Sequence, residues 1–196
     1  MPKSIEVSSL SLYADRVRGI VNSKEEQNRP FIIAIDGRCA SGKTTLASLL
    51  CSALSCPVVH TDDFYLPLLV RSKEIMQNYY GHMDLERLRT EVLVPLSLGE
   101  AVCYSPFSCK SQSYLEKIHI SSPHVIIIEG TYSLFPTLSP YYDLRIFLDT
   151  THQKERLLTR EGEDGYKRFL QMWIPREEEY FLKENPKALS DLVIEN

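Results

Sequence analysis

Eight residues, Gly37 to Thr44, constrain the fold most, because they read G-x-x-x-x-G-K-T. The two glycines let the backbone curl until successive N–H groups point inward at a phosphate. The apolar run 31–35 before the motif is typical of a buried parallel strand, and the run 46–50 after it begins a helix whose positive end faces the same anion. Strand, glycine loop and helix are the setting of a phosphate-binding P-loop, so the sequence predicts a nucleotide site.

Two side chains of the motif are predicted to contact the phosphates and their metal directly. Lys43 supplies a positive charge for the β- and γ-phosphate oxygens, and the Thr44 hydroxyl is expected to bind Mg²⁺. The predicted nucleotide-binding residues of the loop are Gly37, Ala40, Ser41, Gly42, Lys43, Thr44 and Thr45.

Length, charge and cysteine usage limit the classes of protein to be considered. A chain of 196 residues, 43% of them hydrophobic, is expected to form one domain, or one domain with a small lid. The net charge of −4 gives no basic footprint for nucleic acid or an anionic membrane. Five cysteines without a C-x-x-C pair, and no apolar leader or membrane-spanning run, predict reduced thiols in a cytoplasmic protein.

Apolar strands alternate with helices, which predicts a parallel sheet covered on both faces, the three-layer α/β/α fold of P-loop proteins. The expected strands cover 31–35, 57–60, 124–130, 143–149 and the tail 189–194, giving a mostly parallel five-stranded sheet. The expected helices cover 8–23, 84–98, 151–161 and a stretch from residue 166 that is interrupted near Pro175.

Within this single domain of residues 1–196, four regions are expected to differ from the α/β core. Residues 1–29 are expected to form an N-terminal helix and a linker. Residues 66–83 are expected to form a mobile loop with some helix, and residues 104–120 are expected to form a projecting β-hairpin. Both segments are expected on the side of the phosphate acceptor. Residues 151–168 predict a helical lid.

Acidic residues follow the apolar strands at the edge of the sheet where ligands gather in such folds. Asp62, Glu129 and Asp149 each come just after a strand, and Glu129 is expected to bind Mg²⁺ or its water. The sequence has no guanine-specifying N-K-x-D motif, and it has Glu129-Gly130 where oligomeric ATPases carry Asp-Glu. These acids therefore favour a small-molecule kinase over a switch GTPase or an ATPase machine.

Asp62 stands where a small-molecule kinase needs its catalytic base. Because phosphoryl transfer is largely dissociative, a carboxylate serves chiefly by orienting the acceptor hydroxyl toward the γ-phosphate. Asp63 competes for this role, and since neighbouring strand residues point in opposite directions, one of the two is expected to face the substrate. The alternative is that both acids form or cap a turn.

Arg156 and Arg160 lie four residues apart on a predicted helix and so share one face. A lid that carries them over the triphosphate would neutralise the charge that develops on the transferred group, which makes both candidate catalytic residues. The alternative is a solvated pair matched by Glu155 and Glu161.

Aromatic residues gather in the segments that flank the proposed acceptor side, where a planar base or ring could stack. Each of them alone is more often part of a core than of a binding platform. They are Phe64, Tyr65, Tyr79, Tyr80, Tyr104, Phe107 and Tyr132. The five histidines lack metal-binding spacing, and Trp173 is expected to serve in packing.

This ordered set of motifs resembles the uridine kinase-like family of P-loop small-molecule kinases, which also holds phosphoribulokinase, bacterial pantothenate kinase and nicotinamide riboside kinase. The matching segments are 37–44, Asp62-Asp63-Phe64-Tyr65, Asp84 before a helix, 104–108, 128–130, 143–149 and the pair Arg156 and Arg160. The resemblance implies ATP and Mg²⁺ as cofactors, Asp62 as base, lid arginines, and acceptor contacts from Tyr65 and Asp84. The candidate acceptor-binding residues are Asp63, Tyr65, Asp84, Phe107 and Tyr132.

The sequence departs from the nucleoside-phosphorylating members on the acceptor side. Their D-H-P-D reads here as residues 81–84, G-H-M-D, and their P-x-Y-D reads as 105–108, S-P-F-S. Their lid motif R-x-x-x-R-D ends here in Arg160-Glu161. The leading hypothesis is a uridine or cytidine kinase-like enzyme, and nicotinamide riboside, pantothenate or a sugar alcohol are the alternative acceptors. A non-catalytic nucleotide-binding regulatory module is the alternative from another class, and a homo-oligomer is compatible with the sequence.

Overall fold

The computed structural model describes residues 3–24, 28–121 and 123–196. Its centre is a five-stranded, all-parallel sheet in the order β2-β7-β1-β8-β9. The strands are β1 (Phe31–Gly37), β2 (Val58–His60), β7 (Val125–Glu129), β8 (Leu144–Asp149) and β9 (Leu192–Glu195). This sheet confirms the fold class predicted from the sequence, including the short last strand.

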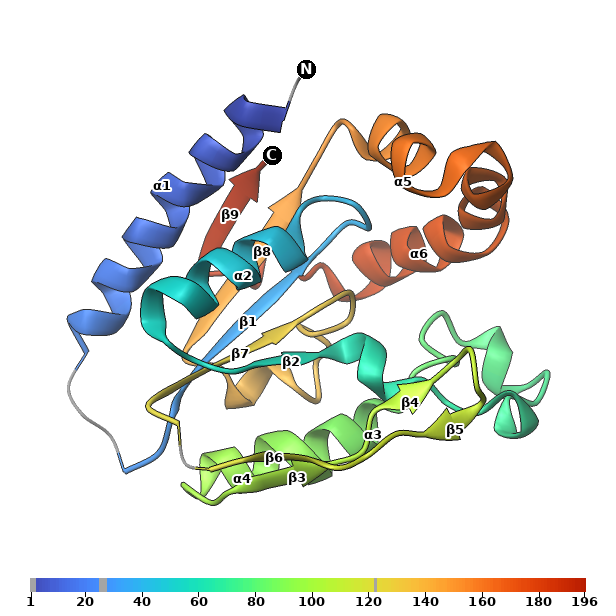
Figure 1. The fold of residues 1–196 in the computed structure, drawn as a ribbon. Coiled ribbons are helices and arrows are strands. Elements are labelled where there is room, and N and C mark those ends of the chain that lie inside the picture. Colours follow the sequence, from blue (N-terminus) through green and yellow to red (C-terminus); the bar gives the residue numbers. More distant parts are fainter. Residues whose placement is uncertain (1–2, 25–27, 122) are drawn as a thin grey trace.

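Alternate residues of β1 serve two hydrophobic cores, one on each face of the sheet. Ile33 and Ile35 pack in the core that includes helices α1 (Lys3–Asn22) and α2 (Lys43–Leu54), which lie side by side (Figure 1). Ile32 and Ala34 belong to the core on the opposite face. All residues of β1 are buried, and each large apolar side chain buried in this way contributes about 1.5–3 kcal/mol.

The opposite face is covered by helices from the middle and the end of the chain. The helix expected at 84–98 runs through α3 (Leu85–Leu88), the π-helical turn η4 (Arg89–Leu93) and α4 (Val94–Ser97). It stops before Gly99, which has a φ of 74°. Helix α6 (Ile174–Glu184) contributes the fully buried Tyr180 to the same core.

The two segments predicted to lie on the acceptor side, 104–120 and 66–83, contain antiparallel strands and short 3₁₀ turns respectively. The projecting hairpin pairs β3 (Val102–Tyr104) with β6 (Ile118–Ile120), and β4 (Phe107–Ser108) with β5 (Ser113–Tyr114), all antiparallel. Residues 66–83 contain two 3₁₀ turns, η2 (Leu68–Val70) and η3 (Ile75–Gln77). Figure 1 shows these segments together at one end of the molecule, next to α3.

The predicted lid region begins a longer helical unit. Helix α5 (Gln153–Arg168) is bent at Gly162, which has a non-helical φ of 70°. It continues through the π-helical turn η6 (Phe169–Trp173) into α6. The interruption expected near Pro175 is this π-helical turn, which lies directly before α6. Pro175 lies in the first turn of α6, where a backbone N–H has no partner within the helix and its absence costs nothing.

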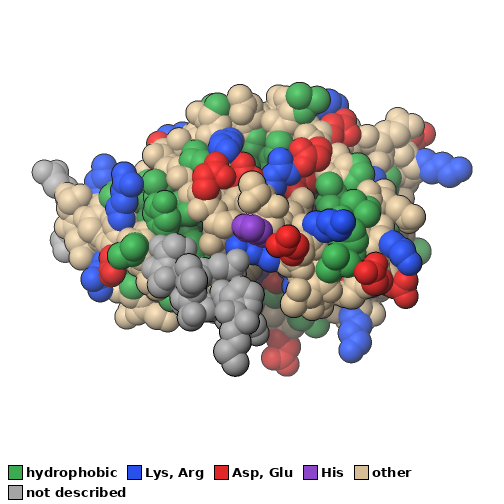
Figure 2. Space-filling model, turned by 90° about the horizontal axis from the view of Figure 1, so that it is seen from above, with side chains coloured by type: hydrophobic (Ala, Val, Ile, Leu, Met, Phe, Trp, Pro, Cys, Tyr) green, Lys and Arg blue, Asp and Glu red, His purple; other side chains and the backbone are tan. Residues whose placement is uncertain are grey.

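The helices and one face of the described surface have the following character. No helix within them has both the length and the apolar composition needed to cross a membrane. Among the described residues on the face drawn in Figure 2, Lys and Arg side chains are interspersed with Asp and Glu, and no continuous basic area forms.

Gly37 ends β1 at a place where no side chain fits. Its φ is 139°, and a Cβ there would lie 1.9 Å from the Leu148 carbonyl oxygen of the paired strand β8. We therefore expect Gly37→Ala to lower the free energy of unfolding by about 3 kcal/mol or more, measured by urea denaturation.

The matched control for this change is Gly19→Ala in α1. No atom lies within 4 Å of a Cβ at Gly19, so this substitution is expected to be neutral or to stabilise the protein by up to about 1 kcal/mol. Equal unfolding free energies for the two variants would show that β8 does not restrict position 37.

Candidate active site

The glycine loop holds a buried lysine over its own backbone. Lys43, the first residue of α2, donates from Nζ to the carbonyl oxygens of Gly37 and Arg38, at 2.8 Å each. Ala40 and Gly42 have positive φ values of 60° and 105°, which curl the loop around the helix N-terminus. The fixed ammonium group and the free N–H groups of the first helical turn form a site suited to an anion.

A threonine and a glutamate form the adjoining oxygen-rich corner. The Thr44 hydroxyl donates to Glu129 Oε1 at 3.1 Å, and His60 Nδ1 lies 2.6 Å from the same oxygen. This hydrogen bond and the negative charges of Glu129, Asp63 and Asp62 raise the pKa of His60. Within the described residues no three His, Cys, Asp or Glu side chains form a complete metal site. Thr44 and Glu129 offer two neighbouring oxygen donors. This donor set fits an ion such as Mg²⁺, which takes few protein ligands and completes its shell with phosphate and water oxygens.

Asp62 and Asp63 lie in the 3₁₀ turn η1 (Thr61–Phe64), which follows β2, so the strand expected to alternate through them is absent. They nevertheless point to different places. Asp62 lines the cavity described below, whereas the Asp63 carboxylate accepts a hydrogen bond of 3.1 Å from the Tyr104 hydroxyl. Asp62 is thus the better placed of the two for a reacting hydroxyl.

Burial among protein atoms raises the pKa of Asp62. The positive charge of Lys43 acts in the opposite direction, and the charge of Glu129 adds to the rise. The side chain nonetheless keeps contact with solvent inside the cavity. A carboxylate with this environment is poised to take a proton more readily than an ordinary aspartate.

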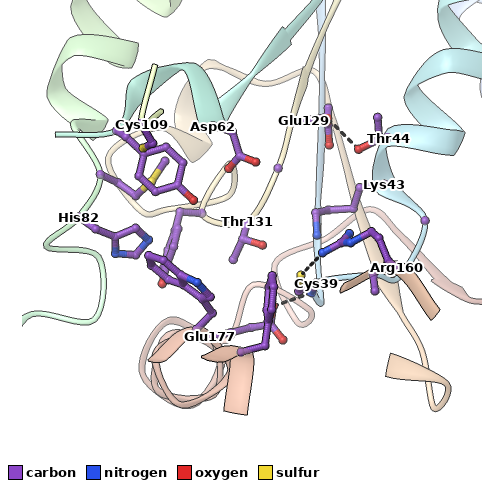
Figure 3. A pocket seen from close by; sticks show the side chains of 18 of the residues that line it. Cys39, Lys43, Thr44, Asp62, His82, Cys109, Glu129, Thr131, Arg160 and Glu177 are labelled. Atoms are coloured by element: carbon purple, nitrogen blue, oxygen red, sulfur yellow. Dashed lines mark hydrogen bonds between the residues drawn. The ribbon is translucent and has the colours of Figure 1, made fainter. Parts of the chain in front are cut away.

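These groups share one cavity of about 600 Å³ at the carboxyl edge of the sheet (Figure 3). In the view of Figure 3, Asp62 lies between Lys43 and Arg160 on one side and His82 on the other. One end of the cavity thus lies at the glycine loop, and the other end lies among aromatic residues. The predicted site residues that line it are Ala40, Gly42, Lys43, Thr44, Thr45, Asp62, Tyr65, Glu129, Tyr132 and Arg160.

Comparisons with known proteins decide the family. No protein-family model matches the chain. It is 30% identical over 155 residues to uridine-cytidine kinase B of Dictyostelium discoideum, an alignment that covers 74% of this chain and 64% of that protein. It is also 30% identical over 156 residues to a pantothenate kinase of Psychromonas ingrahamii, covering 68% of this chain and 48% of that protein. The chain belongs to the uridine kinase-like family of P-loop kinases.

A solved structure of a possible uridine kinase from Bacillus stearothermophilus has the same fold. Its TM-score is 0.74 with 21% identity, over 97% of this chain and 100% of that one. Among the curated relatives, this member of the uridine kinase-like family spans 64% of the Dictyostelium protein and 48% of the Psychromonas one. These relatives establish the family of the chain, and its reaction and acceptor are inferred below.

Some of the predicted site residues lie beside the cavity and do not line it. Gly37 and Ser41 belong to the glycine loop but do not line the cavity. Arg156 donates from Nη1 to the carbonyl oxygens of Ala40 and Ser41, at 3.2 Å each, and so braces the loop from α5. Arg160 does line the cavity, with Nη2 3.6 Å from Cys39 Sγ.

Two predicted acceptor contacts have other neighbours. The Asp84 carboxylate caps the N-terminus of α3 by accepting from the Arg87 backbone N–H at 3.1 Å. Phe107 is buried in the hairpin, with its ring edge against Tyr114 at a centroid distance of 5.4 Å. Neither lines the cavity, whereas Tyr65 and Tyr132 do.

Two buried acidic residues near the glycine loop were not predicted from the sequence. The Glu177 carboxylate on α6 accepts from the Cys39 N–H at 2.5 Å and from Gln153 at 2.8 Å, and it lines the cavity. Burial raises its pKa, with Lys43 acting in the opposite direction. Asp36 accepts from the Gly37 and Leu134 N–H groups and from the Tyr180 hydroxyl, which ties α6 to the start of the glycine loop. For Asp36, the sequence signal was an acidic residue inside an apolar strand. For Glu177 there was none, because it lies in a run of glutamates typical of an exposed helix.

Proposed function

We propose that this protein is an ATP-dependent kinase that transfers the γ-phosphate to a hydroxyl of a small metabolite, with a nucleoside as the leading acceptor. The observation that carries the proposal is the single cavity lined by Lys43, Asp62 and Glu129. A cationic side chain at the glycine loop, a candidate base and a candidate metal ligand in the same cavity support this proposal, because phosphoryl transfer requires all three near one reacting pair.

ATP and Mg²⁺ are the proposed cofactors. The glycine loop and Lys43 would hold the phosphates, and Thr44 with Glu129 would hold the ion. When bound, Mg²⁺ supplies positive charge that offsets the charge of the phosphate oxygens. The oxygen donors and the exposed helix N-terminus fit both groups.

The protein side chains supply orientation and charge. Asp62 would accept the hydrogen bond of the acceptor hydroxyl, align it with the γ-phosphate and take its proton as the bond forms. Arg160 on the cavity wall would neutralise charge on the transferred group, and Arg156 would act on the phosphates through the loop that it braces. Residues 151–168 would thus serve as the lid.

The aromatic end of the cavity supports a ring-bearing acceptor such as uridine or cytidine. Tyr65 and Tyr132 contribute to this wall, while Asp84 and Phe107, at positions of the nucleoside-kinase motifs, lie off it. Nicotinamide riboside, pantothenate and sugar alcohols therefore stay in the set of acceptors to test. We also infer a cytoplasmic location, since all five cysteines are free thiols.

A coupled assay of ADP release tests the proposal. The protein with ATP and Mg²⁺ is compared without acceptor and with uridine, cytidine, other nucleosides, nicotinamide riboside, pantothenate and common sugars. We expect one class to raise turnover to about 1–100 s⁻¹, the usual range of kinases. Tight ATP binding without stimulation by any acceptor would instead favour the nucleotide-binding regulatory module.

A further inference from the structure

Thr131 lies where the glycine loop and the turn that carries Asp62 come together. It is the second residue after β7, it is half-buried, and it lines the cavity. Figure 3 shows its hydroxyl oxygen turned toward Lys43 and away from His82. The hydroxyl group therefore faces the half of the cavity in which the phosphates are expected to bind.

The Thr131 hydroxyl shares a backbone partner with the lysine of the glycine loop. Its Oγ1 donates to the Gly37 carbonyl oxygen at 3.4 Å, and Lys43 Nζ donates to the same oxygen at 2.8 Å. The two donor atoms are thus no farther apart than these two distances added together. Most hydroxyl hydrogen bonds are about 2.7–2.8 Å long, so the contact of Thr131 is weak. The hydroxyl can exchange it for a better acceptor beside the ammonium group.

The backbone around Thr131 is fixed from both sides. The Thr61 hydroxyl, in the turn η1, donates to the Thr131 carbonyl oxygen at 3.2 Å. Gly130 has a φ of 137°, and a Cβ there would lie 1.9 Å from the same Thr61 hydroxyl oxygen. Tyr132 has a left-handed φ of 74°, and its own hydroxyl donates to the Tyr79 carbonyl oxygen at 3.0 Å. Backbone strain of this kind persists only where the surrounding contacts enforce it, so the position of the Thr131 hydroxyl is set before any ligand binds.

We propose that Thr131 is a further catalytic residue, whose hydroxyl donates a hydrogen bond to an oxygen of the phosphoryl group during its transfer from ATP to the acceptor. This rests on the proposed kinase function of the same cavity. Thr131 contacts the loop of Lys43 through Gly37 and the turn of Asp62 through its own carbonyl oxygen. The donor and the acceptor of the phosphoryl group have to meet between these two segments. A hydrogen-bond donor fixed there stabilises the transferred charge without reorganisation at the moment of reaction.

Thr131 keeps its own proton in this step. The bond from phosphorus to the oxygen that bridges the β- and γ-phosphates breaks, and ADP leaves with its electron pair. A bond from phosphorus to the acceptor oxygen forms, and Asp62 takes the proton that the acceptor hydroxyl loses. Because Thr131 acts through a hydrogen bond alone, a side chain of the same shape without the hydroxyl removes its whole contribution.

Thr131→Val is that change, and the ADP-release assay measures its effect with two phosphate acceptors. One is the compound of the tested panel that gives the highest turnover, and the other is water, so that ATP is hydrolysed. We expect kcat to fall by about 10- to 100-fold with both, because the hydroxyl acts on the group that both reactions transfer. The KM of the compound and the affinity for ATP, measured by calorimetric titration, are expected to stay within about threefold of the wild type.

Two further variants define the cause of the loss. Thr131→Ser keeps the hydroxyl and is expected to recover most of kcat. The matched control is Thr90→Val, which removes an exposed hydroxyl that donates to the Glu86 carbonyl oxygen at 2.9 Å and does not line the cavity. It is expected to have the kcat of the wild type with both acceptors.

Wild-type kcat in Thr131→Val would overturn the inference and leave the kinase in place. The same holds for equal losses in Thr131→Val and Thr131→Ser, and for a fall in ATP affinity as large as the fall in kcat, since the hydroxyl would then serve only to brace Gly37. If the wild-type protein released no ADP with any compound or with water, the kinase and the role of Thr131 would both be refuted.

Discussion

Asp62→Asn is expected to lower kcat by about 10²–10⁴-fold, while ATP binds at least as tightly as before. The amide keeps the shape of the side chain but cannot take the proton of the acceptor hydroxyl. Removing a negative charge from the cavity that also holds Lys43 and Glu129 relieves repulsion of the triphosphate, so nucleotide affinity is not expected to fall. Steady-state kinetics and calorimetric titration with ATP and Mg²⁺ measure the two quantities separately.

The same variant is expected to change the pH profile. Because burial raises the pKa of Asp62, its protonated, inactive form persists to a higher pH than in an aspartate free in solution. In the wild type, kcat/KM should therefore fall as the pH drops through this raised pKa, and this acid limb should be absent in Asp62→Asn.

Asp63→Asn is the matched comparison, because Asp63 is the neighbouring acid and is hydrogen-bonded to Tyr104 instead of lining the cavity. We expect it to cost less than about tenfold in kcat. If Asp63→Asn abolished turnover and Asp62→Asn did not, the assignment of the base would be reversed.

The sequence was sufficient for the fold because its strongest signals are local. The seven residues of β1 and the glycine loop form a contiguous strand, turn and helix, each specified by its own residues. The cause of the different directions of Asp62 and Asp63 could not be predicted from local sequence. They depend on a 3₁₀ turn that packs against α3 and the hairpin. Alternation along a strand predicted different directions for the two acids, and they do have different neighbours, but they lie in a 3₁₀ turn and not in a strand.

Tyr65 and Tyr132 at the aromatic end of the site were among the predicted residues, but His82 and Trp173 were not, because these parts are distant in sequence. His82 and Trp173 are 4.9 Å apart between ring centroids, yet about half the chain lies between them, and each alone resembles a packing residue. Asp84 shows a different limit of motif reading. A motif position indicated an acceptor contact, whereas the structure shows the carboxylate capping α3, a local role open to any aspartate that precedes a helix.

Lys43→Ala is expected to weaken ATP binding by about 10- to 150-fold, the loss that corresponds to a charge-assisted hydrogen bond of about 1.5–3 kcal/mol. The ammonium group is held in place by the Gly37 and Arg38 carbonyl oxygens, at 2.8 Å each, so its charge is preorganised at the loop before nucleotide arrives. The N–H groups at the start of α2 remain in the variant, which is why we expect weakened binding and not its complete loss.

Calorimetric titration with ATP and Mg²⁺ measures this loss, and two further variants define its cause. Lys43→Arg keeps the charge, but its planar guanidinium does not reproduce a point charge between two carbonyl oxygens, so we expect only partial recovery. Lys117→Ala, which removes an exposed lysine from the hairpin, controls for net charge and should bind ATP as the wild type does. Unchanged ATP affinity in Lys43→Ala would mean that the phosphates bind elsewhere. It would then remove the basis for placing Asp62 next to the γ-phosphate, because the position of the base is argued from the cavity that it shares with Lys43.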